Sequence, residues 1–510
     1  MVQNRAPLRE AVLSGRPLAS TREDAGSKTA SIFGIRSVTP CTRVYRDPWG
    51  SAPPLRRICW GAMEARNSAQ RAGEPLFPVL TGRLKGMTPE RVAWYQRARI
   101  QAALIDAVAQ RSFTDSTVAE LVESAAVSKT TFYEHFASKE DCFLQTYDDI
   151  ITRVAERVSR ACGGAGEPSE RLRAALTAFV DVVVDEPAAG KLALIDVLSV
   201  GASGIARHEA GLETFEKLVG RVLLESPSAP PPPAETITAI AGGIRGIVYR
   251  KMRAGALDSL PDLVDLLAAW ILNFQAPDSA IVARATEAAA QPRSEAAAGG
   301  STQLDWNEPP DSPRSRRSLT QRERIVRGVA QLAISEGFES VTVRAISATS
   351  GTSNQTFYEH FANKREALIA AFELSAAEGV RSISAAFESM DRKPEAAGAA
   401  MRAMLEHVAG NHVFARLTFF ELQTAGPLAL DRADGVLDGV IEFLIPTVTP
   451  AELRAKVPRP ILQAIGHGVS AVIQHELSRK PETLPELAPA LTRFVLAAIN
   501  SSPETSRAGP

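Results

Sequence analysis

Residues 131–137 read TFYEHFA, and residues 356–362 read TFYEHFA again. The same offset of 225 residues pairs a much longer stretch, because residues 116–144 align without gaps on residues 341–369. Near the end of each copy, AIAGGIRGIV at 239–248 aligns on AIGHGVSAVI at 464–473. An internal repeat this extensive indicates that a whole structural unit of about 190 residues is present twice.

The composition is that of a soluble globular protein. Of the 510 residues, 45% are hydrophobic and 23% are charged, and the net charge is −1. Any basic surface for nucleic acid must therefore be local and balanced by acidic surface elsewhere. The sequence contains no run of about 18 apolar residues, so no membrane span is predicted. Cys41, Cys59, Cys142 and Cys162 have no disulfide or zinc-site spacing, which favours a reducing compartment, and we expect a cytoplasmic protein.

Apolar residues recur with a helical period in both copies, and strand-like alternation is not sustained anywhere. Ile100, Ala103, Leu104, Ala107 and Val108 fall on one helix face, and Ile325, Val329, Leu332 and Ala333 repeat that stripe. The sequence therefore predicts an all-α protein with two tandem helix-turn-helix and helical-bundle units.

Changes in composition predict the domain boundaries. Residues 1–75 lack apolar periodicity and are expected to be disordered or to lie upstream of the true start, with Met63 and Met87 as internal alternatives. Residues 276–318 are rich in Ala, Pro, Ser and Gly and are expected to form a flexible linker. The predicted domains are 76–145 (first helix-turn-helix), 146–275 (first ligand and dimerisation bundle), 319–370 (second helix-turn-helix), 371–500 (second bundle) and 501–510 (tail).

A helix-turn-helix pattern occupies the repeated segment. A short helix is expected to begin at Thr117 or Thr342, followed by turns at about 124–127 and 349–352. Gly351 suits a turn that requires positive φ, whereas Ala126 is less comfortable there. Ser128 and Ser353 are good N-caps for the second helix, whose amino-terminal residues would lie near base edges in the DNA major groove. The phenylalanines, Phe132 and Phe136 with Phe357 and Phe361, are expected to pack inward.

The polar side chains of the second helix and its neighbours remain for DNA. Lysine and threonine can bond base edges or phosphates, and tyrosine and histidine suit phosphate oxygens. The two tyrosines and two lysines could instead cover the rim of the small core, and the histidines could pack against the next helix. The predicted DNA-binding residues are Thr117, Ser128, Lys129, Thr130, Thr131, Tyr133, His135 and Lys139 in the first copy, and Thr342, Ser353, Asn354, Gln355, Thr356, Tyr358, His360 and Lys364 in the second.

The two copies differ at the start of this second helix. Lys129–Thr130 in the first copy correspond to Asn354–Gln355 in the second. Lysine favours guanine edges, whereas Asn and Gln favour adenine. We hypothesise that the two copies read different half-sites; if these residues touch only phosphates, the difference is drift. Basic residues before each first helix, Arg83 with Lys85 and Arg314 with Arg316 and Arg317, either reach phosphates or only solubilise the chain.

At TVAELVESAAVSKTTFYEHFASKE and TVRAISATSGTSNQTFYEHFANKR the sequence resembles the tetracycline-repressor (TetR) family of bacterial transcription regulators. The resemblance is strong over about 50 residues in each copy, and Ala126, Thr352 and Arg365 depart from the usual pattern. It implies an Ω-shaped all-helical dimer that binds double-stranded operator DNA, with a larger domain that takes a small-molecule effector and releases the DNA. A repressor is therefore expected. The tandem duplication is itself unusual for the family.

The last two helices of each copy resemble the family's dimer interface, and small residues such as Gly242, Gly246 and Gly468 would allow close helix approach. The chain could form an internal pseudo-dimer or self-associate as a homodimer. Candidate pocket residues are Phe179, Phe215, Tyr249, Met401, Met404, Phe414, Phe419 and Phe420, although apolar stripes are core more often than pocket.

The sequence gives less support to other classes of function. No HExxH, G-x-S-x-G, P-loop or paired-carboxylate pattern indicates an enzyme. His407, His412, His467 and His475 lack metal-ligand spacing, so no metal or cofactor is expected. The alternative is a helical assembly protein whose helix-turn-helix units no longer bind DNA.

Overall fold

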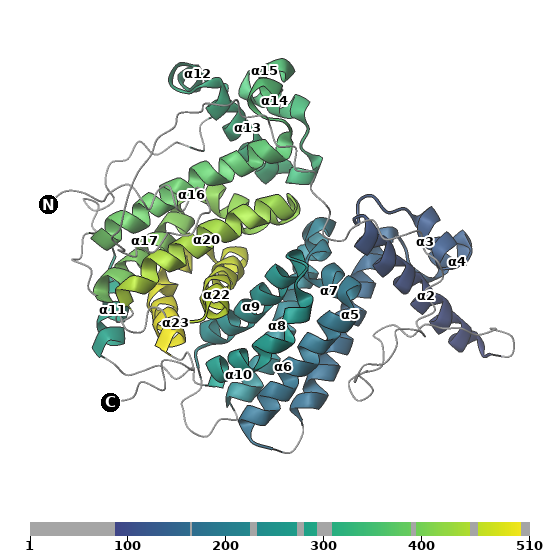
Figure 1. Ribbon diagram of the computed structural model, residues 1–510. Helices are drawn as coiled ribbons and strands as arrows, with labels where there is room; N and C mark the ends of the chain where they lie inside the picture. Colours follow the sequence, from purple (N-terminus) through teal and green to yellow (C-terminus); the bar gives the residue numbers. More distant parts are fainter. Residues whose placement is uncertain are drawn as a thin grey trace, which may run out of the picture.

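The computed structural model describes residues 87–163, 166–224, 232–272, 280–292, 306, 309–388, 394–448 and 457–500. Throughout these ranges the regular structure is helical and no strand occurs, which confirms the all-α prediction (Figure 1). The segments 1–75 and 501–510, and the basic pair Arg83 and Lys85, lie outside the described residues.

The first unit contains nine α-helices within the described ranges. Helices α2 (Pro89–Gln110), α3 (Val118–Ser124) and α4 (Lys129–His135) form a three-helix group that we call the first headpiece. The larger bundle follows, with α5 (Lys139–Cys162), α6 (Pro168–Asp185), α7 (Pro187–Leu194), α8 (Ala202–Leu224), α9 (Ala234–Arg253) and α10 (Val264–Leu272).

The second unit repeats this order. Helices α13 (Gln321–Glu336), α14 (Val343–Ser350) and α15 (Asn354–His360) form the second headpiece. The bundle contains α16 (Lys364–Glu388), α17 (Pro394–Gly410), α18 (His412–Arg416), a π-helical turn over Leu417–Glu421, α19 (Leu422–Thr424), α20 (Pro427–Val448), α22 (Arg459–Arg479) and α23 (Ala488–Asn500). Figure 1 shows the two headpieces at separate corners of the molecule.

The predicted apolar stripes form the headpiece cores. Ile100, Leu104 and Val108 of α2 are fully buried, and Ile325, Val329 and Ala333 of α13 repeat them. The four predicted phenylalanines are buried as well, with at most 3% of any of them exposed. The identical heptapeptide therefore serves the same packing role twice.

The prediction of a structureless linker over 276–318 is wrong for its described part. Residues Ala280–Ala290 form α11, which packs against α17 and α23, and Pro313–Ser318 form the short helix α12. Val282, Ala285 and Ala289 are buried, and Gly398 of α17 lies directly against the backbone carbonyl of Ala285. Alanine has the highest helix propensity and a small side chain, so an Ala-rich segment can form a tightly packed helix as well as a linker.

Helices α9 and α22 join the two units, because they pack along each other within one chain. A Cβ added to Gly243 would lie 2.6 Å from the carbonyl oxygen of Ala464, and one added to Gly468 would lie 2.5 Å from that of Ala239. The backbones approach this closely only because both positions lack a side chain. This is the packing that the internal pseudo-dimer hypothesis requires.

Charged groups surround this apolar contact. Arg250 of α9 donates two hydrogen bonds to Asp438 of α20, at 3.0 and 2.8 Å, and Arg253 donates to Asp434 at 2.9 Å. Burial and the neighbouring arginines lower the pKa of His467, which lies on α22, to about 3. The two units are therefore held by apolar packing and by partly buried ion pairs that fix their register.

We expect Gly243→Ala to destabilise the folded chain by about 1–3 kcal/mol, because its methyl group must displace the backbone of α22. The measurement is thermal unfolding followed by circular dichroism. Gly410→Ala is the matched control, since nothing lies within 4 Å of the added Cβ. Equal effects of the two substitutions would contradict the close-approach account.

Candidate DNA-binding headpieces and ligand cavities

The first helix of each helix-turn-helix begins at a threonine cap. The Thr117 hydroxyl accepts from the backbone N–H of Glu120 at 3.3 Å, and the Glu120 carboxylate accepts from the backbone N–H of Thr117 at 2.9 Å. Thr342 accepts from the backbone N–H of Ala345 at 3.1 Å. The reciprocal cap at Thr117 and the single cap at Thr342 each satisfy backbone N–H groups that a helix N-terminus leaves without a partner. Thr117 and Thr342, both predicted to bind DNA, therefore position the motif through its backbone.

The turn takes a left-handed conformation in both copies. Gly351 has a φ of 63°, and Ala126 at the same position has a φ of 47°. Alanine is strained there because its Cβ crowds the backbone. An arginine from each preceding helix supports the turn, since Arg99 donates to the Ala126 carbonyl and Arg324 to the Gly351 carbonyl, both at 3.4 Å. Sequence reasoning missed this pair of arginines, although the two occupy equivalent positions of the repeat.

The second helix begins at the predicted serine caps. Ser128 Oγ accepts from the backbone N–H of Thr131 at 2.9 Å, and Ser353 Oγ accepts from that of Thr356 at 3.0 Å. The hydroxyls of each serine and threonine also share a hydrogen bond. All four of these residues therefore close the helix N-terminus.

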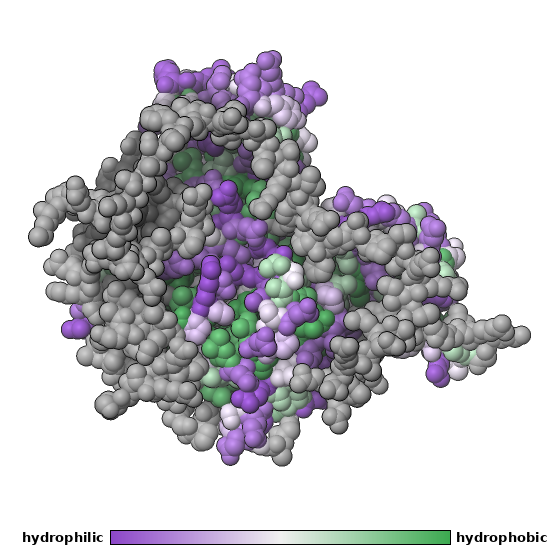
Figure 2. Space-filling model, viewed as in Figure 1, coloured by the Kyte–Doolittle hydropathy of each residue, from purple (hydrophilic) through white to green (hydrophobic). Residues whose placement is uncertain are grey.

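The side chains beyond the caps face outward. Tyr133 is 50% exposed and Tyr358 is 60% exposed, which is unusual for large aromatic residues of a folded domain. The differing pairs Lys129–Thr130 and Asn354–Gln355 are exposed too. Gln355 donates to Glu359 at 3.2 Å within the same helix. Figure 2 shows a hydrophilic surface at the end of the molecule where α12, α14 and α15 lie.

The two predicted histidines lie in different surroundings. His135 shares a 3.1 Å hydrogen bond with Gln96 of α2, and burial lowers its pKa. His360 is exposed. The packing interpretation therefore fits His135, whereas His360 stays available to a ligand.

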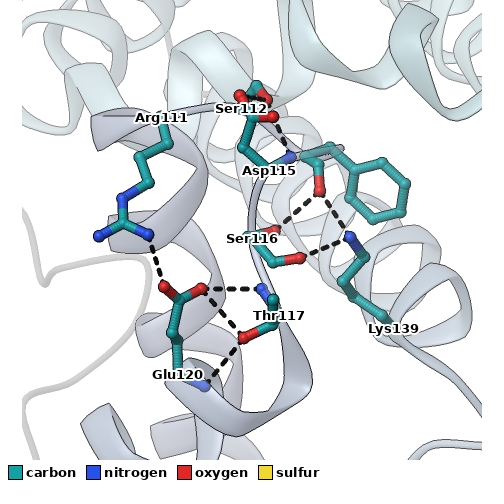
Figure 3. Close-up of polar contacts among 8 residues, drawn as sticks. Arg111, Ser112, Asp115, Ser116, Thr117, Glu120 and Lys139 are labelled. Carbon is teal, nitrogen blue, oxygen red and sulfur yellow. Dashed lines mark hydrogen bonds and ion pairs between the residues drawn. The ribbon is translucent and has the colours of Figure 1, made fainter.

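Lys139 and Lys364, both predicted to bind DNA, make hydrogen bonds within the chain in this structure. The Lys139 ammonium donates to the carbonyls of Phe113 and Ser116, both at 2.7 Å, above the Phe113 ring (Figure 3). Lys364 does the same with the carbonyls of Phe338 and Glu339, at 3.1 and 2.9 Å. Each lysine thus ties the loop before the helix-turn-helix to the helix after it. A sequence pattern cannot tell this contact from a phosphate contact, because both require a lysine beside the motif.

Helix α12 brings the predicted basic arm to the second headpiece. Arg314, Arg316 and Arg317 are exposed, and a Cβ added to Gly351 would lie 3.0 Å from the Arg316 guanidinium. Arg316 also donates to the Asp311 carbonyl at 2.8 Å. The arm is therefore a structured helix against the turn, and its three arginines are exposed.

One cavity lies within the first unit, and another lies in the second unit with part of its wall from α7 and α9 of the first. Cavity 1 encloses about 930 Å³, including its open mouth, between α5, α6, α8 and α9, and Phe179 and Phe215 line it as predicted. Cavity 2 encloses about 1250 Å³ on the same basis, and Met404, Phe414, Phe419 and Tyr249 line it. The other two candidates, Met401 and Phe420, line neither. Corresponding positions of the repeat line both cavities, for example Ile151 and Ala376, Leu212 and Leu437, and Phe215 and Val440.

No group of three or more His, Cys, Asp or Glu residues in the described ranges could hold a metal ion. None of the described helices has the length and apolar character needed to cross a membrane.

Known proteins are similar to parts of this chain. The family described as bacterial regulatory proteins, tetR family, matches residues 100–146 and again residues 325–381. The HTH-type transcriptional activator FasR from Mycolicibacterium smegmatis is 27% identical over 117 residues, which are 23% of this chain and 52% of FasR. The chain thus spans about half the length of this curated relative.

Two solved structures are also similar to parts of this chain. The fatty acid degradation regulator FadR from Bacillus halodurans matches 35% of this chain and 94% of its own length, with 15% identity and a TM-score of 0.33. The transcriptional regulator FadR from Bacillus subtilis, solved in complex with stearoyl-CoA, matches 34% and 96%, with 13% identity and a TM-score of 0.30.

Two capped helix-turn-helix motifs with exposed second helices, each followed by a helical bundle, have the architecture that DNA-binding proteins use to place a helix in the major groove. The tetR family model matches both motifs, so the chain carries two TetR-like helix-turn-helix units in tandem.

We expect Ala126→Gly to stabilise the first headpiece by about 1 kcal/mol, because glycine relieves the left-handed strain. Hydrogen exchange of the α3 and α4 amides should slow by about fivefold. Gly351→Ala is the reciprocal variant and should speed exchange in α14 and α15. Unchanged exchange in both variants would show that the turn stores no strain.

Proposed function

We propose that this regulator binds one operator with its two non-identical headpieces, which a single chain presents as an internal pseudo-dimer, and that a small-molecule effector controls its DNA affinity. The observation that carries the proposal is the paired exposure of Tyr133 and Tyr358 beside Lys129–Thr130 and Asn354–Gln355. An identical exposed tyrosine supports a shared phosphate contact, and the differing pairs support distinct base contacts.

The operator is expected to be asymmetric. Two headpieces of one assembly reach successive major grooves about 34–36 Å apart. Lys129 would prefer guanine in one half-site, whereas Asn354 and Gln355 would prefer adenine in the other. His360, which is exposed, and the cations of α12 would add phosphate contacts on the second side.

The effector is expected to act through the bundles. A ligand that binds one arrangement of helices better than another shifts the population toward that arrangement. Cavity 1 is bordered by α5, which starts directly after the first headpiece, and by α9, which packs on α22. Occupancy of cavity 1 would therefore alter the spacing between the headpieces.

We propose repression, in which the effector releases the operator. Activation is the second candidate, because the relative FasR is described as an activator. A reporter gene placed behind the selected operator distinguishes them: deletion of the regulator raises expression under repression and lowers it under activation.

The test of DNA binding is site selection with the purified full chain, followed by measurement of operator affinity against salt. Tyr133→Phe combined with Tyr358→Phe should weaken binding about tenfold if each hydroxyl contributes a phosphate hydrogen bond worth about 0.5–1.5 kcal/mol. The wild-type affinity should fall steeply with salt. Absence of any selected sequence and a flat salt dependence would support the assembly-protein alternative.

The half-site hypothesis can be tested by replacing the two differing residues of the second copy with those of the first. Asn354→Lys combined with Gln355→Thr should convert the second half-site preference into the first, so that the selected operator becomes a symmetric repeat. The matched control is Glu339→Gln, a polar substitution in the loop before the second helix-turn-helix. An unchanged selected sequence after the exchange would show that these residues read no bases.

A further inference from the structure

Cavity 1 is mostly apolar, with the exposed Arg221 of α8 in its lining and a separate, buried group of polar side chains from α5, α8 and α9. Its walls are residues such as Leu172, Leu176, Phe179, Phe215 and Val219. Tyr147 of α5, His208 of α8 and Arg245 of α9 are the polar exceptions that lie together. Such a cavity can take an apolar body, and the polar group determines what else the ligand must carry.

Arg245 is a buried cation without a counter-ion. Its Nη1 donates to His208 Nε2 at 3.1 Å, while its Nε is buried and has no hydrogen-bond partner. Arg250 and Arg253, on the same helix, each form ion pairs with aspartates of α20, but no carboxylate among the described residues pairs with Arg245. Burial lowers the Arg245 pKa. An unpaired buried charge is costly, so a persistent one indicates a partner that the chain itself does not supply.

His208 adds a second free donor. It is 4% exposed, and burial followed by the charge of Arg245 lowers its pKa to about 3, so the ring is neutral. Because a guanidinium only donates, His208 Nε2 must accept, which places the imidazole proton on Nδ1. Nδ1 is buried and has no partner.

Tyr147 completes the group. Its hydroxyl lies against Gly211 of α8, where any larger residue would displace it. Burial raises the Tyr147 pKa, with the charge of Arg245 acting in the opposite direction, so the phenol keeps its proton and can donate. Three donors, one of them a full positive charge, are therefore among the residues that line cavity 1.

The second unit has lost this group. At the offset of 225 residues, Tyr147, His208 and Arg245 correspond to Phe372, Ala433 and Ser470, and Gly211 corresponds to Val436. All four of these replacements line cavity 2. The tyrosine and the glycine that accommodates it have changed together, as they would if the donors served a ligand of cavity 1 alone.

We propose that cavity 1 binds an amphipathic carboxylate, with its anionic head on Arg245, His208 and Tyr147 and its apolar body between α5, α6 and α8. A monoanion fits this buried group better than a phosphate, because Arg245 is its one guanidinium and neutralises one charge, whereas a dianion there would leave a buried charge unpaired. The proposal deepens the proposed function by naming the ligand class of its effector site.

The test is calorimetric binding to the full-length chain with decanoate, decanol, decylamine and decanoyl-CoA below their aggregation concentrations. Decanoate should bind one per chain and at least tenfold more tightly than each of the others. Equal binding of decanol, or preference for the thioester of decanoyl-CoA, would overturn the anionic-head assignment.

Substitutions test the residues. Arg245→Gln should weaken decanoate binding at least tenfold and leave decanol binding unchanged, and Arg245→Lys should restore part of the loss. Tyr147→Phe, which introduces the residue type found at position 372, should also weaken decanoate selectively and serves if Arg245→Gln fails to fold. Ser470→Ala is the matched control in the second unit and should have no effect.

Arg245 also borders cavity 2, so the occupied cavity must be identified. Leu212→Trp fills cavity 1 and should abolish decanoate binding, whereas Leu437→Trp at the corresponding position of cavity 2 should not. The reverse result would overturn the proposal. Operator affinity measured with and without decanoate tests the carboxylate site and its effector role separately. If decanoate binds without changing the affinity for DNA, the carboxylate site stands and its effector role is refuted.

Discussion

The close approach of α9 and α22 is the constraint on which the rest of the molecule depends. Glycines at 243 and 468 bring each helix within contact of the other's backbone carbonyls. One continuous apolar core consequently runs from the first headpiece through α9 into α22 and α23. Cavities 1 and 2 lie on either side of this seam, and Arg245 borders both. We propose that a change in how the two helices pack would reach both bundles through this shared wall.

Having both units in one chain frees each from the symmetry that an association of identical units imposes. In a two-fold dimer of identical subunits every substitution appears twice. Here the start of the second helix, the turn residue at 126 or 351, and the donors of cavity 1 each differ between units, while the buried phenylalanines stay the same. The packing that builds the motif is retained, whereas the residues at the start of the second helix and the donors of cavity 1 have diverged.

The sequence predicted the motif well because its signals are local. Cap residues, the turn and the spacing of Phe132 and Phe136 all act within one or two helical turns, and the structure has each of them. Lys139 could not be assigned in this way, since its partners lie 23 and 26 residues earlier in the chain. The pairing of Arg245 with His208, 37 residues apart, depends on how α8 and α9 pack. Comparison of the two repeats position by position was the signal that could have exposed it.

The central claim is that one chain presents both headpieces to one operator. Native mass spectrometry of the protein on its selected operator, combined with nuclease footprinting, tests it most directly. The account predicts a complex with a single 54.6 kDa chain per operator and protection of two half-sites one helical turn apart. Two chains per operator at the lowest concentration that protects both half-sites would contradict it.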